Sequence, residues 1–167
     1  MQAKITNLLF LCTQNSARSI MAECILNELG AGRFRAYSAG SHPAGRVNPD
    51  ALDLLEGLGH PTDSLGSKSW DVFAEAGIPE MDVVITVCDR AAGETCPLWP
   101  GRPVGAHWPL PDPAAVEGGA AERAAAFAAV YRAIAARVEA LVALPVETLD
   151  DPEALGRRLA EIGARGP

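Results

Sequence analysis

An apolar run that ends in a polar loop and a helix start is the feature that most constrains this chain. Residues 5–12 (ITNLLFLC) are strand-like and deliver Cys12 into a short polar loop. The apolar positions of Ser16–Leu29 then follow helical spacing, and Gly30 is placed to end that helix. We therefore expect a strand followed directly by a helix, with Cys12 at the junction.

Strands and helices alternate along the rest of the chain. Met81–Val87 is the strongest strand signal, because it is largely apolar and mostly β-branched, as a buried parallel strand should be. Residues 122–144 place apolar side chains on one helical face, and Pro145 ends that helix. The other expected elements are strands at 35–40 and 104–107, a helix opened by Asn48-Pro49, a short helix after 67–71, an extended segment at 108–113 and a last helix around 155–162. This alternation predicts an α/β fold, a parallel sheet with helices on both faces.

Length and composition indicate one globular domain. The chain has 167 residues, 49% of them hydrophobic and 21% charged, which suffices for one sizeable core. We assign residues 1–145 to this domain and 146–167 to a C-terminal extension whose short helix packs back on it. The start lacks the pattern of a signal peptide, and no apolar run approaches the ~20 residues of a membrane span.

These features predict a cytoplasmic protein that has no membrane partner. In that compartment the four cysteines are expected to be reduced at rest, so any disulfide should be transient and catalytic. The net charge of −7, without a run of Lys or Arg, argues against a nucleic-acid partner. It also repels an anionic substrate, which a local binding socket would have to overcome.

Three reactive residues are expected to meet at one edge of the sheet. Cys12, Cys88 and Asp112 each lie at or after the carboxyl end of a predicted strand. In parallel α/β sheets, ligands bind at that edge, near the point where the strand order reverses. We therefore expect one site made of residues that are far apart in sequence.

The loop after Cys12 is suited to binding a tetrahedral oxyanion. A loop folded around a helix N-terminus aims backbone N–H groups inward, and the helix dipole adds to their positive field. Arg18 can clamp two oxyanion oxygens in a bidentate fork. The same field should hold the pKa of Cys12 well below the ~8.5 of a free thiol. The residues assigned to oxyanion binding with Arg18 are Thr13, Gln14, Asn15, Ser16 and Ala17.

Several functions remain open on these residues alone. A phosphatase would need only Asp112 as the acid for its leaving group. A reductase would need further thiols, which Cys88 and Cys96 could supply from a short, small-residue loop. A zinc site made by Cys88, Cys96 and His107 lacks the close spacing of common structural sites. Inert cysteines, a merely structural Cys12 and an oxyanion sensor without catalysis are also compatible with these residues.

The remaining cysteine, histidines and tryptophans are interpreted as structural. Cys24 falls on the apolar face of the first helix and is expected in the core. His107 is expected to be packed, whereas His42 and His60 look like surface loop residues. The tryptophans are expected to pack around the rim of the site; they are Trp70, Trp99 and Trp108.

The Cys-x5-Arg-Ser pattern after a strand resembles the low-molecular-weight protein tyrosine phosphatases. The fuller pattern from Cys12 to Glu23 is similar to their arsenate-reductase branch. Four later segments are similar to that branch in the same order: Tyr37-Ser38-Ala39-Gly40, Ser67-Lys68-Ser69-Trp70, Val84-Ile85-Thr86-Val87-Cys88-Asp89, and His107-Trp108 followed by Asp112-Pro113. The resemblance covers most of the chain and implies a four-stranded parallel sheet with helices on both sides.

The resemblance implies a relay of three thiols. Cys12 would attack arsenic, Cys88 would attack Cys12 to release arsenite, and Cys96 would attack Cys88 in turn. Thioredoxin would then reduce the Cys88–Cys96 disulfide. In a glutathione- or mycothiol-linked reductase, the third thiol would come from that small molecule.

The resemblance also implies supporting roles around the loop. Arg18 would clamp the oxyanion, Asp112 would donate a proton, and Ser19 would support the Cys12 thiolate. Asn15 would hold the strained shape of the loop by hydrogen bonding. No tightly bound cofactor is expected, but some family members bind potassium near the loop; the matching positions are Asn15, Glu23, Ser38 and Asp71.

Two departures from the family pattern bear on the substrate. Gln14 stands where the family usually has glycine, which could alter the oxyanion preference. Ala114-Ala115 follow Asp112-Pro113, where the tyrosine phosphatases carry an aromatic residue. Without that aromatic wall, phosphotyrosine loses binding energy relative to a small free oxyanion. The leading prediction is therefore a thioredoxin-coupled arsenate reductase, with a phosphomonoester hydrolase as the rival enzyme.

Overall fold

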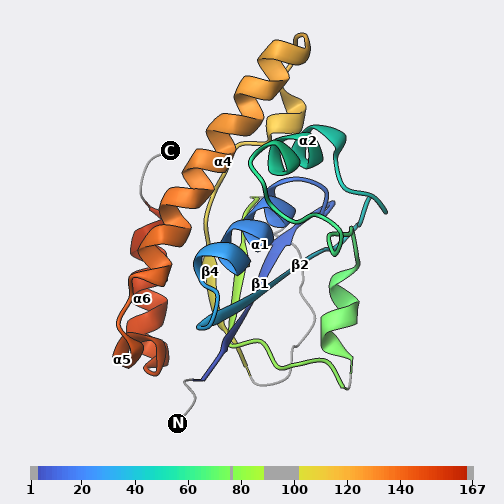
Figure 1. Cartoon of the computed structure of the whole chain (residues 1–167). Coiled ribbons are helices and arrows are strands. Elements are labelled where there is room, and N and C mark those ends of the chain that lie inside the picture. Colours follow the sequence, from blue (N-terminus) through green and yellow to red (C-terminus); the bar gives the residue numbers. More distant parts are fainter. Residues whose placement is uncertain (1–3, 76, 89–101, 165–167) are drawn as a thin grey trace.

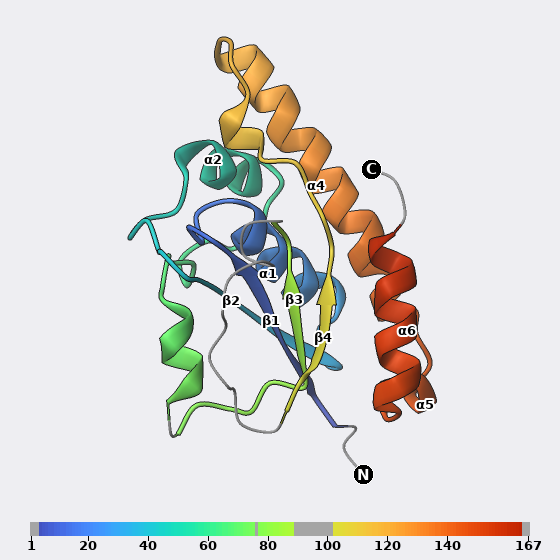
Figure 2. The same ribbon diagram turned by 180° about the vertical axis from the view of Figure 1, so that it is seen from behind.

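A four-stranded parallel sheet forms the centre of the computed structural model, which describes residues 4–75, 77–88 and 102–164. The strands lie in the order β2-β1-β3-β4, as Figure 2 shows from behind. Their bounds are Thr6–Cys12 for β1, Phe34–Gly40 for β2, Val83–Thr86 for β3 and Val104–His107 for β4. The predicted α/β fold class is confirmed.

The strand order reverses next to β1, which places the end of β1 at a ligand-binding edge. β1 pairs with β2 on one side, aligning Cys12 with Gly40, and with β3 on the other, aligning Leu11 with Thr86. Because all the strands are parallel, their carboxyl ends share one edge of the sheet. The loops that follow β1, β3 and β4 therefore start close together.

The helices begin and end near the positions that the sequence predicts. α1 begins at Arg18, two residues later than expected, because residues 13–17 form a loop before it. The Glu122 carboxylate accepts a hydrogen bond of 2.9 Å from the Gly119 N–H at the start of α4. The helix bounds are Arg18–Leu29 for α1, Pro49–Gly57 for α2, Ala120–Val142 for α4, Val146–Leu149 for α5 and Pro152–Gly163 for α6, with 3₁₀ helices η1 at Trp70–Ala74 and η2 at Pro113–Ala115.

The two faces of the sheet carry cores of different size. Leu8 and Phe10 of β1 join a large core with α1, α4 and α6, which lie on the same side of the sheet (Figure 1). Leu9 and Leu11 point the other way, into a smaller core that includes Phe73 of η1. This alternation is what a strand buried on both faces requires. In the described part of the chain, 3₁₀ rather than α-helical structure contributes to the smaller core.

The C-terminal helix α6 shares the large core with β1. Its residues Leu155 and Leu159 are buried, and the Leu159 carbonyl accepts a hydrogen bond of 3.0 Å from the Trp108 indole. Gly163 allows the close approach, because a Cβ there would lie 2.5 Å from Trp108 Cδ1. The segment after residue 145 is therefore packed against β4 and the residue that follows it.

His60 is buried, so the prediction of a surface residue is wrong. Its Nε2 lies 2.6 Å from the hydroxyl of Tyr131 on α4, and its Nδ1 lies 2.6 Å from Glu28 Oε2 on α1. The loop after α2 folds against both helices, which its local sequence does not reveal. Cys24 is in the core as predicted, and burial raises its pKa to about 11. His42 is exposed, as predicted.

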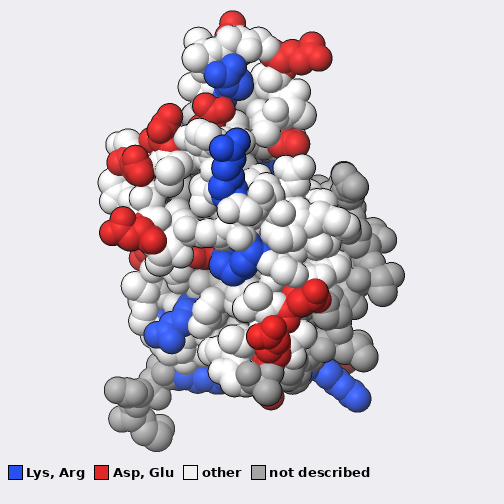
Figure 3. All heavy atoms as spheres, turned by 90° about the vertical axis from the view of Figure 1, so that its right-hand side faces the viewer, with Lys and Arg blue, Asp and Glu red and all other residues white. Residues whose placement is uncertain are grey.

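Acidic and basic side chains are interspersed on the face that includes η1. Figure 3 shows this face with no continuous basic patch over its described residues. None of the helices that the structure describes has the length and apolar character needed to cross a bilayer.

Candidate functional site

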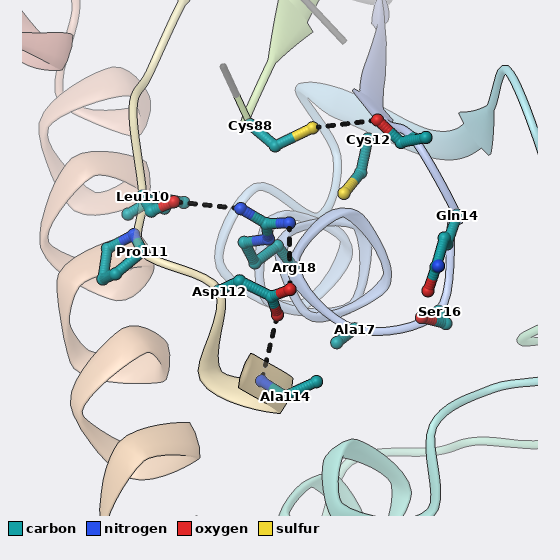
Figure 4. A pocket seen from close by; sticks show the side chains of 11 residues that line it. Cys12, Gln14, Ser16, Ala17, Arg18, Cys88, Leu110, Pro111, Asp112 and Ala114 are labelled. Atoms are coloured by element: carbon teal, nitrogen blue, oxygen red, sulfur yellow. Dashed lines mark hydrogen bonds and ion pairs between the residues drawn. The ribbon is translucent and has the colours of Figure 1, made fainter. Parts of the chain in front are cut away.

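A pocket of about 400 Å³ opens at the carboxyl edge of the sheet. It brings Cys12, Cys88 and Asp112 together, from the ends of β1 and β3 and the segment after β4 (Figure 4). Its lining residues are Cys12, Thr13, Gln14, Ser16, Ala17, Arg18, Cys88, Leu110, Pro111, Asp112 and Ala114. The parallel topology therefore assembles the site from segments up to a hundred residues apart.

Asn15 shapes the loop from behind and does not line the pocket. Its backbone φ of 48° is in the left-handed region, which asparagine tolerates better than most residues. Its side chain is fully buried, donates to Ser19 Oγ at 2.8 Å and accepts from the Lys68 N–H at 2.9 Å. Ser19 is also fully buried and does not line the pocket. Its side-chain hydroxyl accepts the hydrogen bond from Asn15. The Asn15 side chain thus holds the loop by hydrogen bonding, as the resemblance implies, and its assignment to oxyanion binding stays a prediction.

Neighbouring segments hold the rest of the loop in place. The Gln14 carbonyl accepts from Ser67 Oγ at 3.0 Å and from the Ala44 N–H at 2.9 Å. Gly40 lets β2 approach, because a Cβ there would lie 2.5 Å from the Thr13 carbonyl oxygen. Gln14 has no positive φ, so this substitution for glycine imposes no backbone strain. Contacts with other segments of the chain therefore hold the loop in shape.

Arg18 lines the pocket and carries a buried donor without a partner among the described residues. One terminal nitrogen donates to the Leu110 carbonyl at 3.0 Å, and the other lies 3.8 Å from Asp112 Oδ2. Its side chain is only 13% exposed, and no described residue accepts a hydrogen bond from its buried Nε. A buried unpaired donor is costly, and a bound oxyanion would satisfy it.

Asp112 stands at the mouth of the pocket, with its side chain 45% exposed. Its Oδ1 accepts a hydrogen bond of 3.0 Å from the Ala114 N–H and so caps η2. Ala114 lines the pocket at the position where the tyrosine phosphatases are expected to carry an aromatic residue. The wall next to Asp112 is small and apolar.

The pKa of Cys12 is raised, so the prediction of a lowered pKa is wrong. Hydrogen bonding with the Cys88 thiol is the largest cause, burial is the second, and the Arg18 charge lowers the pKa by less. Both cysteines are buried and reduced, and Cys88 Sγ lies 3.6 Å from Thr13 Oγ1. A second buried thiol beside Cys12 thus outweighs the positive field of the loop.

Removing the Cys88 thiol should lower the pKa of Cys12, because the largest raising cause is lost while Arg18 remains. The thiolate is the reactive form, so alkylation of Cys12 in Cys88→Ala should begin at a pH lower by about one unit or more. Iodoacetamide labelling followed by peptide mass mapping measures this midpoint. Cys24→Ala is the matched control and should leave it unchanged. An unshifted midpoint in Cys88→Ala would show that the two thiols are not coupled.

Three of the residues expected near potassium, Asn15, Glu23 and Ser38, make hydrogen bonds with neighbouring side chains. Ser38 Oγ donates to Glu23 Oε1 at 2.6 Å, while Asn15 is engaged with Ser19. Asp71 is exposed and does not line the hollow that Glu23 and Ser38 line. The Lys68 ammonium already lies among these groups, 3.0 Å from the Ser38 carbonyl oxygen. No cluster of three His, Cys, Asp or Glu side chains able to hold a metal occurs within the described ranges.

Cys96 and Trp99 lie outside the described residues, so the third thiol and the zinc site stay predictions. His107 is half-buried, with Nδ1 2.8 Å from Thr86 Oγ1. The sequence carries no signal for the Leu110 carbonyl that holds Arg18. It does carry Lys68, a lone lysine in a serine-rich segment, but no local pattern indicates the role of that lysine.

Comparison with known proteins gives consistent results. The model of the family described as low molecular weight phosphotyrosine protein phosphatase matches residues 7–154. A protein of Shouchella clausii named arsenate reductase is 35% identical over 130 residues, which cover 78% of this chain and 90% of the relative. A protein of Halalkalibacterium halodurans with the same name is 34% identical over the same shares of both chains. A solved structure described as an arsenate reductase in the phosphate binding state has a TM-score of 0.63 and 31% identity, and the match covers 83% of this chain and 97% of that one.

Proposed function

This chain belongs to the low molecular weight phosphotyrosine protein phosphatase family, and from that premise we propose that it is an enzyme that reduces arsenate to arsenite. The observation that carries the proposal is a second buried thiol, Cys88, in the same pocket as Cys12 and Arg18. Hydrolysis of a phosphate ester needs one nucleophile and one acid, and it has no use for Cys88. Reduction needs two electrons, which a pair of thiols supplies by forming a disulfide.

Arsenate binds in the loop through backbone N–H groups and the Arg18 guanidinium. The unpaired Nε of Arg18 and the positive end of α1 favour a tetrahedral oxyanion there. Phosphate and sulfate share this shape and charge, so they should compete. The small wall at Ala114 offers no stacking surface for a phenyl ring, which favours a free oxyanion over phosphotyrosine.

Cys12 then attacks arsenic and forms an S–As bond. The thiol proton of Cys12 and one arsenate hydroxyl leave together as water, which keeps the charge and atoms balanced. Asp112 passes the proton to the departing oxygen, and its position in the pocket lining beside Arg18 supports this role. The pre-shaped loop meanwhile holds the charge that gathers on the remaining oxygens.

Cys88 completes the reduction by attacking Cys12 Sγ. The S–S bond forms as the S–As bond breaks, and the electron pair of that bond stays on arsenic, which is reduced from As(V) to As(III). Arsenite leaves with the proton of the Cys88 thiol. Cys96 then attacks Cys88 and frees Cys12, and thioredoxin reduces the Cys88–Cys96 disulfide. This chemistry suits a reducing, cytoplasmic setting and a role in arsenical resistance.

Single-turnover reduction of arsenate without added reductant tests the relay. Wild type should release one arsenite per chain and carry a Cys88–Cys96 disulfide by mass mapping. Cys96→Ser should release arsenite once and trap a Cys12–Cys88 disulfide. Absence of arsenite and of any disulfide in both proteins would exclude a self-contained relay.

Two further assays distinguish the rival functions. If arsenite appears only when glutathione or mycothiol is added, the third thiol comes from the small molecule and not from Cys96. If the double variant Cys88→Ser/Cys96→Ser turns over an aryl phosphate as fast as wild type, and neither reduces arsenate, the protein is a phosphatase. Saturable phosphate binding without any turnover would indicate an oxyanion sensor.

A further inference from the structure

We propose that the Lys68 ammonium serves as a built-in cation beneath the oxyanion loop, and that this protein therefore takes no potassium ion there. This role of Lys68 is to support the loop and not to take part in the reaction. It can be tested through stability, so its failure and the failure of arsenate reduction are separate results.

The Lys68 ammonium is surrounded by oxygen atoms that a monovalent cation would otherwise attract. Its Nζ lies 2.7 Å from the Gly66 carbonyl oxygen and 3.0 Å from the Ser38 carbonyl oxygen. It also lies 3.9 Å from Glu23 Oε1, and the Lys68 side chain is 31% exposed. The two carbonyls accept hydrogen bonds from the ammonium, and the carboxylate lies within ion-pair distance of its single charge.

Glu23 is the reason that a cation is needed at this point. It is buried on α1, its Oε1 accepts from Ser38 Oγ at 2.6 Å, and its Oε1 also faces Lys68. Burial raises the pKa of Glu23, while the bond from Ser38 and the charge of Lys68 oppose that rise. A potassium ion entering the same hollow would meet the like charge of Lys68 within a few ångströms. One cation already balances this carboxylate.

Lys68 is also tied to the loop by its backbone. Its N–H donates to Asn15 Oδ1 at 2.9 Å, and its carbonyl accepts from the Gly40 N–H at 2.9 Å. Asn15 is the loop residue with a positive φ, so its side-chain bonds hold a strained conformation. The side-chain ammonium of Lys68 is held by two carbonyls, and the backbone N–H of the same residue restrains Asn15. Lys68 is therefore a positioning residue for the loop that carries Cys12.

Melting temperatures in KCl, NaCl and choline chloride at equal ionic strength test this inference. Wild type should melt at the same temperature in all three salts. Lys68→Ala should melt roughly 5 °C or more below wild type in NaCl, because Glu23 loses its partner. KCl, but not choline chloride, should restore about half or more of that loss, since the shortened side chain leaves room for the ion.

Two variants serve as controls for this experiment. Lys68→Met removes the charge but fills the space, so it should lose stability and gain nothing from KCl. Lys4→Ala removes an exposed lysine that pairs with Asp82 at 3.1 Å, and it should change little in any salt. Lys68→Met tests whether the effect of KCl requires the space that a shorter side chain leaves. Lys4→Ala tests whether salt has a general effect on the loss of a lysine.

The stability deficit of Lys68→Met should also depend on pH. The pKa of Glu23 is raised in the folded protein, so the cost of an unpaired Glu23 is absent below the pKa of the unfolded chain and grows as the pH rises toward the folded-state pKa. The deficit should therefore be larger at pH 8 than at pH 5. Arg35 of β2 and the α1 residues Cys24 and Glu28 line the adjoining hollows, and they are unchanged in the variant.

Three results would overturn the inference. A potassium-specific rise in the melting temperature of wild type would show that an ion binds beside Lys68. A folded Lys68→Ala that does not respond to KCl would show that the ammonium does not stand in for a cation. A response of Lys68→Met equal to that of Lys68→Ala would place the ion elsewhere. The melting temperatures of wild type in the three salts decide the first point even if the variants do not fold.

Discussion

Replacing Cys12 with serine should reduce arsenate turnover by at least about 10⁴-fold while the protein stays folded. A hydroxyl is close to a thiol in size, so the pocket and the loop should keep their shape. The serine hydroxyl, however, is a weak nucleophile at neutral pH, and it cannot pass electrons into a disulfide with Cys88. Steady-state arsenate reduction and thermal melting measure the two halves of this prediction.

Cys24→Ser is the matched control for Cys12→Ser. Cys24 is also a buried, reduced cysteine, but it lies outside the pocket, with Sγ 3.9 Å from the Pro61 carbonyl oxygen. Its replacement should leave turnover within a few-fold of wild type, because burial alone gives a thiol no role in catalysis. Appreciable turnover in Cys12→Ser would mean that another group carries the attack, and the proposed mechanism would be wrong.

Replacing Arg18 with lysine should lower kcat/KM for arsenate by about 10²- to 10³-fold. Lysine keeps the positive charge but loses the planar fork and the buried, unpaired Nε donor. It also cannot hold the Leu110 carbonyl and approach Asp112 with two separate nitrogens as Arg18 does. Kinetics over a range of arsenate concentrations, with phosphate as competitor, would show weaker binding of both anions.

Arg123→Lys gives the matched control for the arginine substitution. Arg123 lies on α4 and pairs with Asp50 at 3.4 Å, with both side chains well exposed to solvent. The same chemical change there should leave kcat/KM unchanged, because exposed ion pairs contribute little. If Arg18→Lys binds phosphate and arsenate as tightly as wild type, the guanidinium is not the oxyanion clamp.

Local patterns predicted most of the secondary structure. The β-branched run ending at Thr86 is a strand because such residues pack well on a pleated, buried surface. Asn48 caps α2, accepting from the Asp50 N–H at 2.8 Å, as a residue of its type before proline should. The order of the strands could not be read in this way, since β1 pairs with two strands that are distant in sequence.

The sequence predicted which residues form the candidate site better than it predicted their chemical properties. The positions of Cys12, Cys88 and Asp112 after strands were enough to expect one rim, because parallel strands share their carboxyl edge. The burial of His60 was not predicted, since it depends on segments that come from elsewhere in the chain.

The sequence by itself determined the elements and the reactive residue types. A strand, a helix start or a thiol after a strand depends on a few adjacent residues, so its signal is local. Only the tertiary structure decided the electrostatics. It brought the Cys88 thiol to Cys12, which raises the pKa of Cys12, and it brought the Lys68 ammonium to Glu23. Burial and charge pairing depend on distances through space between remote segments, and residue order does not encode these distances in any short pattern.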